Sequence, residues 1–65
     1  MEFKLYQRVR LMNNEHVDEG ISKNALGYII EIYEDNSLEL EFSNENGITI
    51  ATIVVSENEI ELAEP

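Results

Sequence analysis

The residues best placed for chemistry are two carboxylates, Glu39 and Glu41, separated by one residue in the segment LELEFS (38–43). On a β-strand, alternate side chains share a face and lie roughly 6.6–6.8 Å apart. Glycosidases use paired carboxylates at comparable distances. Acid catalysis also needs a pocket that raises the pKa of one carboxyl group, and a convex strand face provides none. We therefore interpret the pair as a solvated or partner-binding surface.

The other candidates for chemistry are weaker. His16 is the only histidine, and it is expected to be a solvated loop side chain because the nearby acids, Glu15 and Asp18, do not complete a metal-ligand pattern. The stretch 44–47 lacks the acidic ligands of a calcium loop and instead predicts a hairpin turn at Asn46-Gly47. The sequence contains no nucleophile elbow and no glycine-rich phosphate loop. We predict a protein that is not an enzyme and has no catalytic residue, metal or cofactor.

Length and composition restrict the class of protein. A chain of 65 residues makes a single domain, 1–65, and buries only about 60% of its unfolded surface. The absence of cysteine excludes disulfides and fits a cytoplasmic location. No signal peptide is expected, and the longest apolar stretch, 48–55, is too short to cross a membrane.

The elements that must position the carboxylates are predicted to be β-strands, because the hydrophobic period is mostly two. We predict strands over 5–13, 25–34, 38–43, 48–55 and 60–62. A long polar loop follows the first strand, with Ile21 tucked back as a plug, and a single helical turn over 56–59 precedes the last strand. Gly27 within a strand indicates a bulge or a sharp bend.

The third strand has the clearest alternation in the chain. Leu38, Leu40 and Phe42 are expected to face the core, and Glu39 and Glu41 to be exposed. Closing a short sheet into a barrel removes exposed edges. The sequence therefore predicts an all-β fold, a small five-stranded SH3-like barrel with a long loop after the first strand and a helical turn before the last.

A family resemblance supports this fold. It rests on core and turn positions along nearly the whole chain, namely Leu5-Tyr6, Val9, Leu11, Gly20-Ile21, Leu26-Gly27, 29–33, Glu41-Phe42, Gly47 and 60–62. This pattern resembles the short bacterial proteins grouped as domain of unknown function 4926. The resemblance implies a KOW-type, SH3-like small barrel without catalytic residues, and it points to an antitoxin or immunity role. Asn24 stands near the expected position of the first loop glycine, and asparagine tolerates positive φ.

Charge is distributed unevenly along the chain. All four basic side chains lie in residues 1–23, whereas residues 24–65 hold ten carboxylates and no Lys or Arg, and the net charge is -10. Direct nucleic-acid binding is not expected, because phosphate contacts need Lys and Arg. An acidic face instead matches a basic protein surface. Solubility alone is the alternative explanation of the charge.

We predict a partner-binding surface that combines acidic residues with anchors. Glu39 and Glu41, with Glu31 nearby, form its main face, and Glu59 and Glu61 form a second acidic strip. The expected anchors are Tyr33, Ile48 and Ile50. In 48–55 both the even-numbered and the odd-numbered positions are largely apolar, although only one side of a barrel strand faces the core. A bulge near Thr52 that swaps the two faces is the structural alternative.

Three functions fit this surface. We favour an immunity- or antitoxin-type inhibitor that binds a basic toxin, such as a nuclease, in a stoichiometric complex. The second is a nucleic-acid mimic that titrates a DNA-binding defence enzyme. The third is a structural subunit of a larger assembly, in which the apolar strand 48–55 carries the interface. A homodimer is a separate, open expectation about partners.

Overall fold

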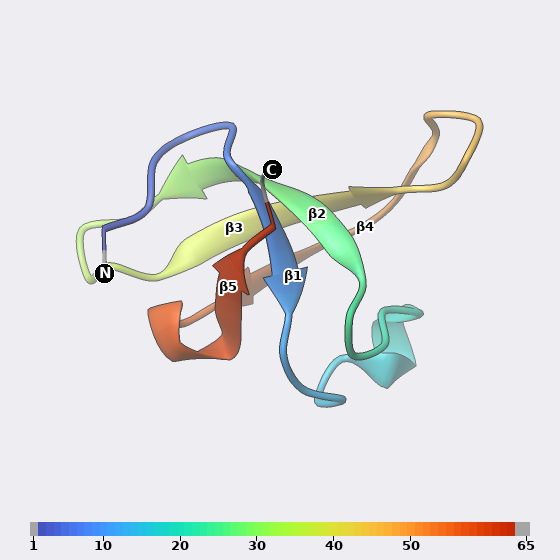
Figure 1. Cartoon of the computed structure of the whole chain (residues 1–65), viewed down its shortest axis with the longest axis horizontal. Coiled ribbons are helices and arrows are strands. Elements are labelled where there is room, and N and C mark those ends of the chain that lie inside the picture. The colour runs from blue at the N-terminus through green and yellow to red at the C-terminus, as the bar shows by residue number, and fades with distance from the viewer. Residues whose placement is uncertain (1, 64–65) are drawn as a thin grey trace.

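Five antiparallel strands form one strongly curved sheet in the computed structural model, which describes residues 2–63 (Figure 1). The strands are β1 (Arg8–Leu11), β2 (Leu26–Ile32), β3 (Leu38–Ser43), β4 (Thr49–Val55) and β5 (Ile60–Leu62), in the spatial order β4-β3-β2-β1-β5. Within the described residues the only helices are two 3-10 turns, η1 (Val17–Glu19) and η2 (Glu57–Glu59). The all-β class, the long first loop and the helical turn before the last strand are confirmed, in a small barrel-like fold.

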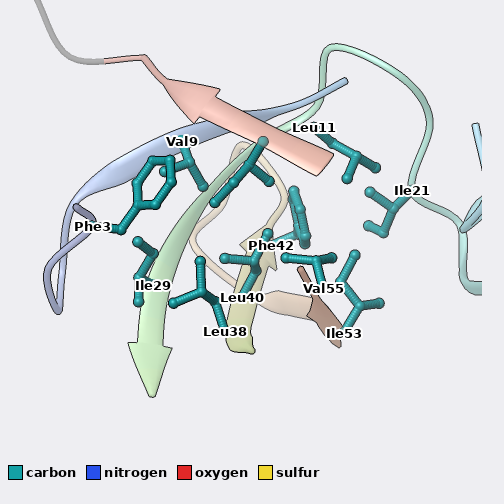
Figure 2. Close-up of a cluster of buried hydrophobic side chains, with 11 residues drawn as sticks. Phe3, Val9, Leu11, Ile21, Ile29, Leu38, Leu40, Phe42, Ile53 and Val55 are labelled. Carbon is teal, nitrogen blue, oxygen red and sulfur yellow. The ribbon is translucent and has the colours of Figure 1, made fainter. Parts of the chain in front are cut away.

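The core is one cluster of apolar side chains that all five strands contribute to (Figure 2). Leu38, Leu40 and Phe42 are buried, as the alternation of the third strand predicts. Ile21 is 2% exposed and closes the core from the long loop, so the predicted plug is confirmed. The remaining members are Phe3, Val9, Leu11, Ile29, Ile53, Val55 and Ile60.

The first strand is shorter than the predicted 5–13, because the chain turns at Leu5 and Tyr6. Tyr6 has a φ of 70°, and the backbone N–H of Gln7 donates to the carbonyl of Lys4 at 3.3 Å. The strand therefore begins at Arg8. A positive φ is uncommon for a non-glycine residue, and the tyrosine at position 6 gives no signal in the sequence that predicts it.

The second strand ends at Ile32, before the predicted boundary at residue 34. The backbone N–H of Tyr33 donates to the carbonyl of Ser37, and the N–H of Asn36 donates to the carbonyl of Tyr33, both at 2.9 Å. Asn36 has a φ of 68°, which asparagine tolerates better than most residues. Asn24 has a φ of 77°, in the left-handed region that asparagine tolerates.

The two expected bulges lie elsewhere. Gly27 pairs regularly with Val9, and the bulge of the second strand falls between Ile29 and Glu31. Gly27 is needed for a different reason: a Cβ there would lie 2.8 Å from the Phe42 ring and 2.9 Å from a backbone carbonyl oxygen. The bulge expected near Thr52 lies at the start of β4.

That bulge changes the alternation only at the start of β4, where Thr49 pairs with Ser43 and bonds to Glu41 on the outward side. From Ala51 to Val55 the alternation is regular. Ile53 and Val55 are buried, and Ala51 packs against the core. Ile50 and Val54 are exposed. The surplus of apolar residues in 48–55 is therefore on the surface of the protein.

Candidate partner-binding surface

The candidate site is the face of β2, β3 and β4 that points away from the core. In the ladder between β2 and β3, Glu31 is paired with Glu39 and Tyr28 with Glu41. In the ladder between β3 and β4, Glu39 is opposite Val54. The register thus gathers three of the predicted residues, Glu31, Glu39 and Glu41, on neighbouring positions of one surface.

The carboxylates of this surface repel one another. Like charges directly opposite in a sheet are destabilising, and Glu31 and Glu39 occupy such a pair. The strands β2, β3 and β4 contribute no basic side chain, because residues 24–65 contain neither Lys nor Arg. The charges of this surface therefore destabilise the fold of the isolated chain, and they attract positively charged groups.

Two hydroxyl groups partly cover the carboxylates of β3. The Tyr33 hydroxyl donates to Glu39 Oε1 at 2.5 Å, and Thr49 Oγ1 donates to Glu41 Oε2 at 3.1 Å. The hydrogen bond to Glu39, with the negative charge around it, raises the pKa of Tyr33. Glu39 and Glu41 point outward as predicted, but both are half-buried rather than fully exposed.

Apolar side chains lie beside the acids. Ile50 is 53% exposed, Val54 54% and Tyr28 49%, and Ile48 is exposed where the β3–β4 turn ends. We call the set Tyr28, Glu31, Tyr33, Glu39, Glu41, Ile50 and Val54 the outer face. Val54 was not among the predicted site residues. The sequence did contain a signal for Val54, because Val54 and the predicted anchor Ile50 are an even number of residues apart on one strand and therefore share a face.

Glu59 and Glu61 do not make a second free acidic strip. Glu59 Oε1 accepts hydrogen bonds from Asn13 Nδ2 and His16 Nε2, both at 3.0 Å, and Glu59 Oε2 accepts the backbone N–H of Ser56 at 2.9 Å. Glu61 forms an ion pair with Arg10 at 3.0 Å. Both predicted residues are thus engaged within the chain, on β5 and the turn before it.

The expectation of a solvated His16 is wrong. Its side chain is 17% exposed and lies between Glu59, at 3.0 Å, and Glu19, at 3.7 Å. It ties the long first loop to η2, 43 residues later in the chain. Partial burial alone would raise the pKa of Glu59, but the hydrogen bonds from Asn13, Ser56 and His16 outweigh burial and lower it.

The described residues form no enclosed pocket and no group of three side chains that could hold a metal ion. None of the helices among residues 2–63 has the length and apolar character needed to cross a membrane. The chemistry that the outer face offers is charge and apolar contact on an open surface.

Fold and surface together define a small all-β domain with an acidic, partly apolar sheet face. The chain belongs to the family described as Domain of unknown function (DUF4926), whose model matches residues 5–62. The family resemblance drawn from the core and turn positions is therefore confirmed. Neither a curated protein nor a solved structure matches the chain.

Proposed function

We propose that the protein binds a basic protein through the outer face, as an immunity- or antitoxin-type inhibitor of a toxin such as a nuclease. The observation that carries this proposal is the combination of Glu31, Glu39 and Glu41 with exposed apolar neighbours on strands that lack any basic residue. A nuclease presents a basic substrate site because it binds phosphate, and an acidic plug is complementary to such a site.

The energetics of the face support binding rather than a purely solubilising role. Placing Glu31 opposite Glu39 costs folding free energy in the isolated chain. A basic partner relieves this repulsion and is attracted over a distance of about 10 Å at 0.1 M salt. Charge mainly governs the rate of association, and tight binding also needs buried anchors. Tyr28, Tyr33 and Val54 supply apolar area next to the charges.

The same acids could imitate the phosphates of a nucleic acid, but the apolar side chains favour the inhibitor. Val54 is opposite Glu39, and Ile50 lies on the same strand. A phosphate mimic gains nothing from exposed isoleucine and valine, whereas a cognate protein surface can bury them. The expected partner is therefore one specific basic protein and not a range of DNA-binding proteins.

The test uses the products of the genes that flank this one, each purified and presented to the immobilised chain. We expect one basic product to bind in a one-to-one complex, to lose its nuclease activity, and to be released by salt. Unrelated DNA-binding proteins serve as controls and should not be retained. If several of them bind equally well, and duplex DNA displaces each, the protein is a nucleic-acid mimic and the inhibitor proposal fails.

A further inference from the structure

A second interaction surface lies at the edge of the sheet, on strand β4. Within residues 2–63, β4 pairs only with β3, and no backbone group of Thr49–Val55 forms a hydrogen bond outside that ladder. Alternate residues of an antiparallel edge strand direct their N–H and C=O groups away from the sheet. Such an edge is a template for pairing with another strand.

The β4 edge lacks most of the features that normally prevent pairing. Edge strands are usually short or carry charged residues or proline. The other edge, β5, follows this rule, because it has three residues and includes Glu61. By contrast, β4 has seven residues, TIATIVV, without charge or proline, and its bulge lies at its start, so Ala51–Val55 pair regularly with β3.

The charge pattern of the chain points to the occupant. Residues 46–56 are the longest stretch of the sequence without a charged side chain. For a chain with a net charge of -10, this strand is where a second copy can approach with the least repulsion. A basic partner, by contrast, would gain no charge contact from β4 itself.

We propose that two copies of the chain pair through β4, in an antiparallel, two-fold symmetric arrangement centred on Thr52. In this register Thr52 faces its own copy, Ala51 faces Ile53, and Ile50 faces Val54. Ile50 of one copy and Val54 of the other then contact each other across the interface and remain on the outer face. A symmetric contact of this kind is self-complementary and closes as a dimer.

The dimer makes one continuous sheet, and the two-fold axis stands perpendicular to it. Both copies therefore present their carboxylates Glu39 and Glu41 on the same side. The two acidic clusters are separated by the two paired β4 strands, so each remains open to a partner. This inference concerns the edge of the sheet and does not depend on the proposed inhibitor function.

A single cysteine tests the register, because the native sequence contains none. Cα atoms of directly opposed antiparallel residues lie about 4.5–5.5 Å apart, which suits a disulfide. The Thr52→Cys chain should therefore cross-link to its own copy under mild oxidation. The matched control is Thr49→Cys, an exposed threonine of the same strand whose two copies would be roughly 20 Å apart in this register.

We expect Thr52→Cys to form the disulfide dimer at least about tenfold faster than Thr49→Cys. Equal rates for the two variants would overturn the proposed register. Sedimentation of the native chain provides the second measurement. Its mass should be twice the 7.5 kDa of one chain, and dimerisation should strengthen as salt rises, because salt screens the repulsion between the copies.

The variant Thr52→Lys should weaken the dimer at least about tenfold, because it places two like charges opposite each other. The substitution makes the chain less negative overall, so a general charge effect would act in the opposite direction. Tyr28→Lys, which adds the same charge on β2 away from the edge, should leave dimerisation intact. A native chain that stays monomeric up to about 1 mM at high salt would refute the proposal.

Discussion

Replacing Glu59 with glutamine tests how the long first loop is fastened to the barrel. Glu59 Oε1 accepts from Asn13 and His16, and Oε2 accepts from the backbone of Ser56. A glutamine has the same shape but only one acceptor oxygen, because its other terminal atom is an NH2 donor. In either orientation of the amide, at least one of these donors faces another donor.

The expected loss of stability in Glu59→Gln depends on which of these hydrogen bonds are broken. Losing the bond to Ser56 removes half of the capping box of η2, which contributes about 1 kcal/mol. Losing the bonds from Asn13 and His16 removes charge-assisted bonds of about 1.5–3 kcal/mol each. We expect Glu59→Gln to lower the free energy of unfolding by about 2 kcal/mol at neutral pH. The melting temperature of a domain this small should fall by roughly 8–16 °C.

The effect should depend on pH with a definite sign. The pKa of Glu59 is lower in the folded protein than its ordinary value of 4.5. Its stabilising contribution is therefore present above pH 4.5 and is lost as the pH falls through the lower folded-state pKa. The difference in stability between the native chain and Glu59→Gln should be largest at neutral pH and should shrink in acid.

Urea unfolding followed by circular dichroism, at neutral and acidic pH, measures both effects. The matched control is Glu57→Gln, which removes the same charge from an exposed position of the same turn. The control should change the free energy of unfolding by less than about 0.5 kcal/mol. If Glu59→Gln is no more destabilising than Glu57→Gln, the hydrogen-bonded cluster around Glu59 does not fasten the loop.

Two further predictions concern the strands of the outer face. Gly27→Ala should lower the free energy of unfolding in urea by about 1–3 kcal/mol, because the new methyl group would overlap the Phe42 ring and a backbone carbonyl. A loss below about 0.5 kcal/mol would contradict this close approach. The pKa of Tyr33 should lie above 10.0 in an ultraviolet titration, in which Tyr33→Phe identifies the signal of this tyrosine by removing it. Glu39→Gln should lower the pKa of Tyr33. A signal that Glu39→Gln leaves unchanged would show that the hydroxyl does not donate to Glu39.

Local patterns in the sequence predicted the barrel well. The alternation in 38–43 identified the buried and outward sides of β3, and Asn46-Gly47 marked the turn before β4. Ile21, an isolated apolar residue in a polar loop, indicated the plug. In each case the signal lies within a few residues of the structure that it determines, so one stretch of sequence is sufficient.

Features that depend on contacts between distant segments could not be read in this way. The cluster of His16 and Glu59 joins residues 43 positions apart, and no local pattern marks either of them as a partner of the other. The role of Gly27 depends on the Phe42 ring of the next strand. The bulge at the start of β4 is set by its register with β3. For the same reason Glu61, expected on a second acidic strip, is found paired with Arg10.

The most direct test of the proposed function is the rate at which the chain associates with the basic product of a flanking gene. The test variant carries Glu39→Lys and Glu41→Lys on the outer face. The matched control carries Glu45→Lys and Glu57→Lys, two exposed positions outside that face, and changes the net charge by the same amount. Circular dichroism first establishes that both variants are folded.

Association is followed by biolayer interferometry at low and moderate salt. We predict that the outer-face variant associates at least about tenfold more slowly than the control at low salt, and that the difference narrows as salt screens the charges. If the two variants associate at the same rate, the acids of the outer face serve only to keep the protein soluble, and binding through this face is refuted.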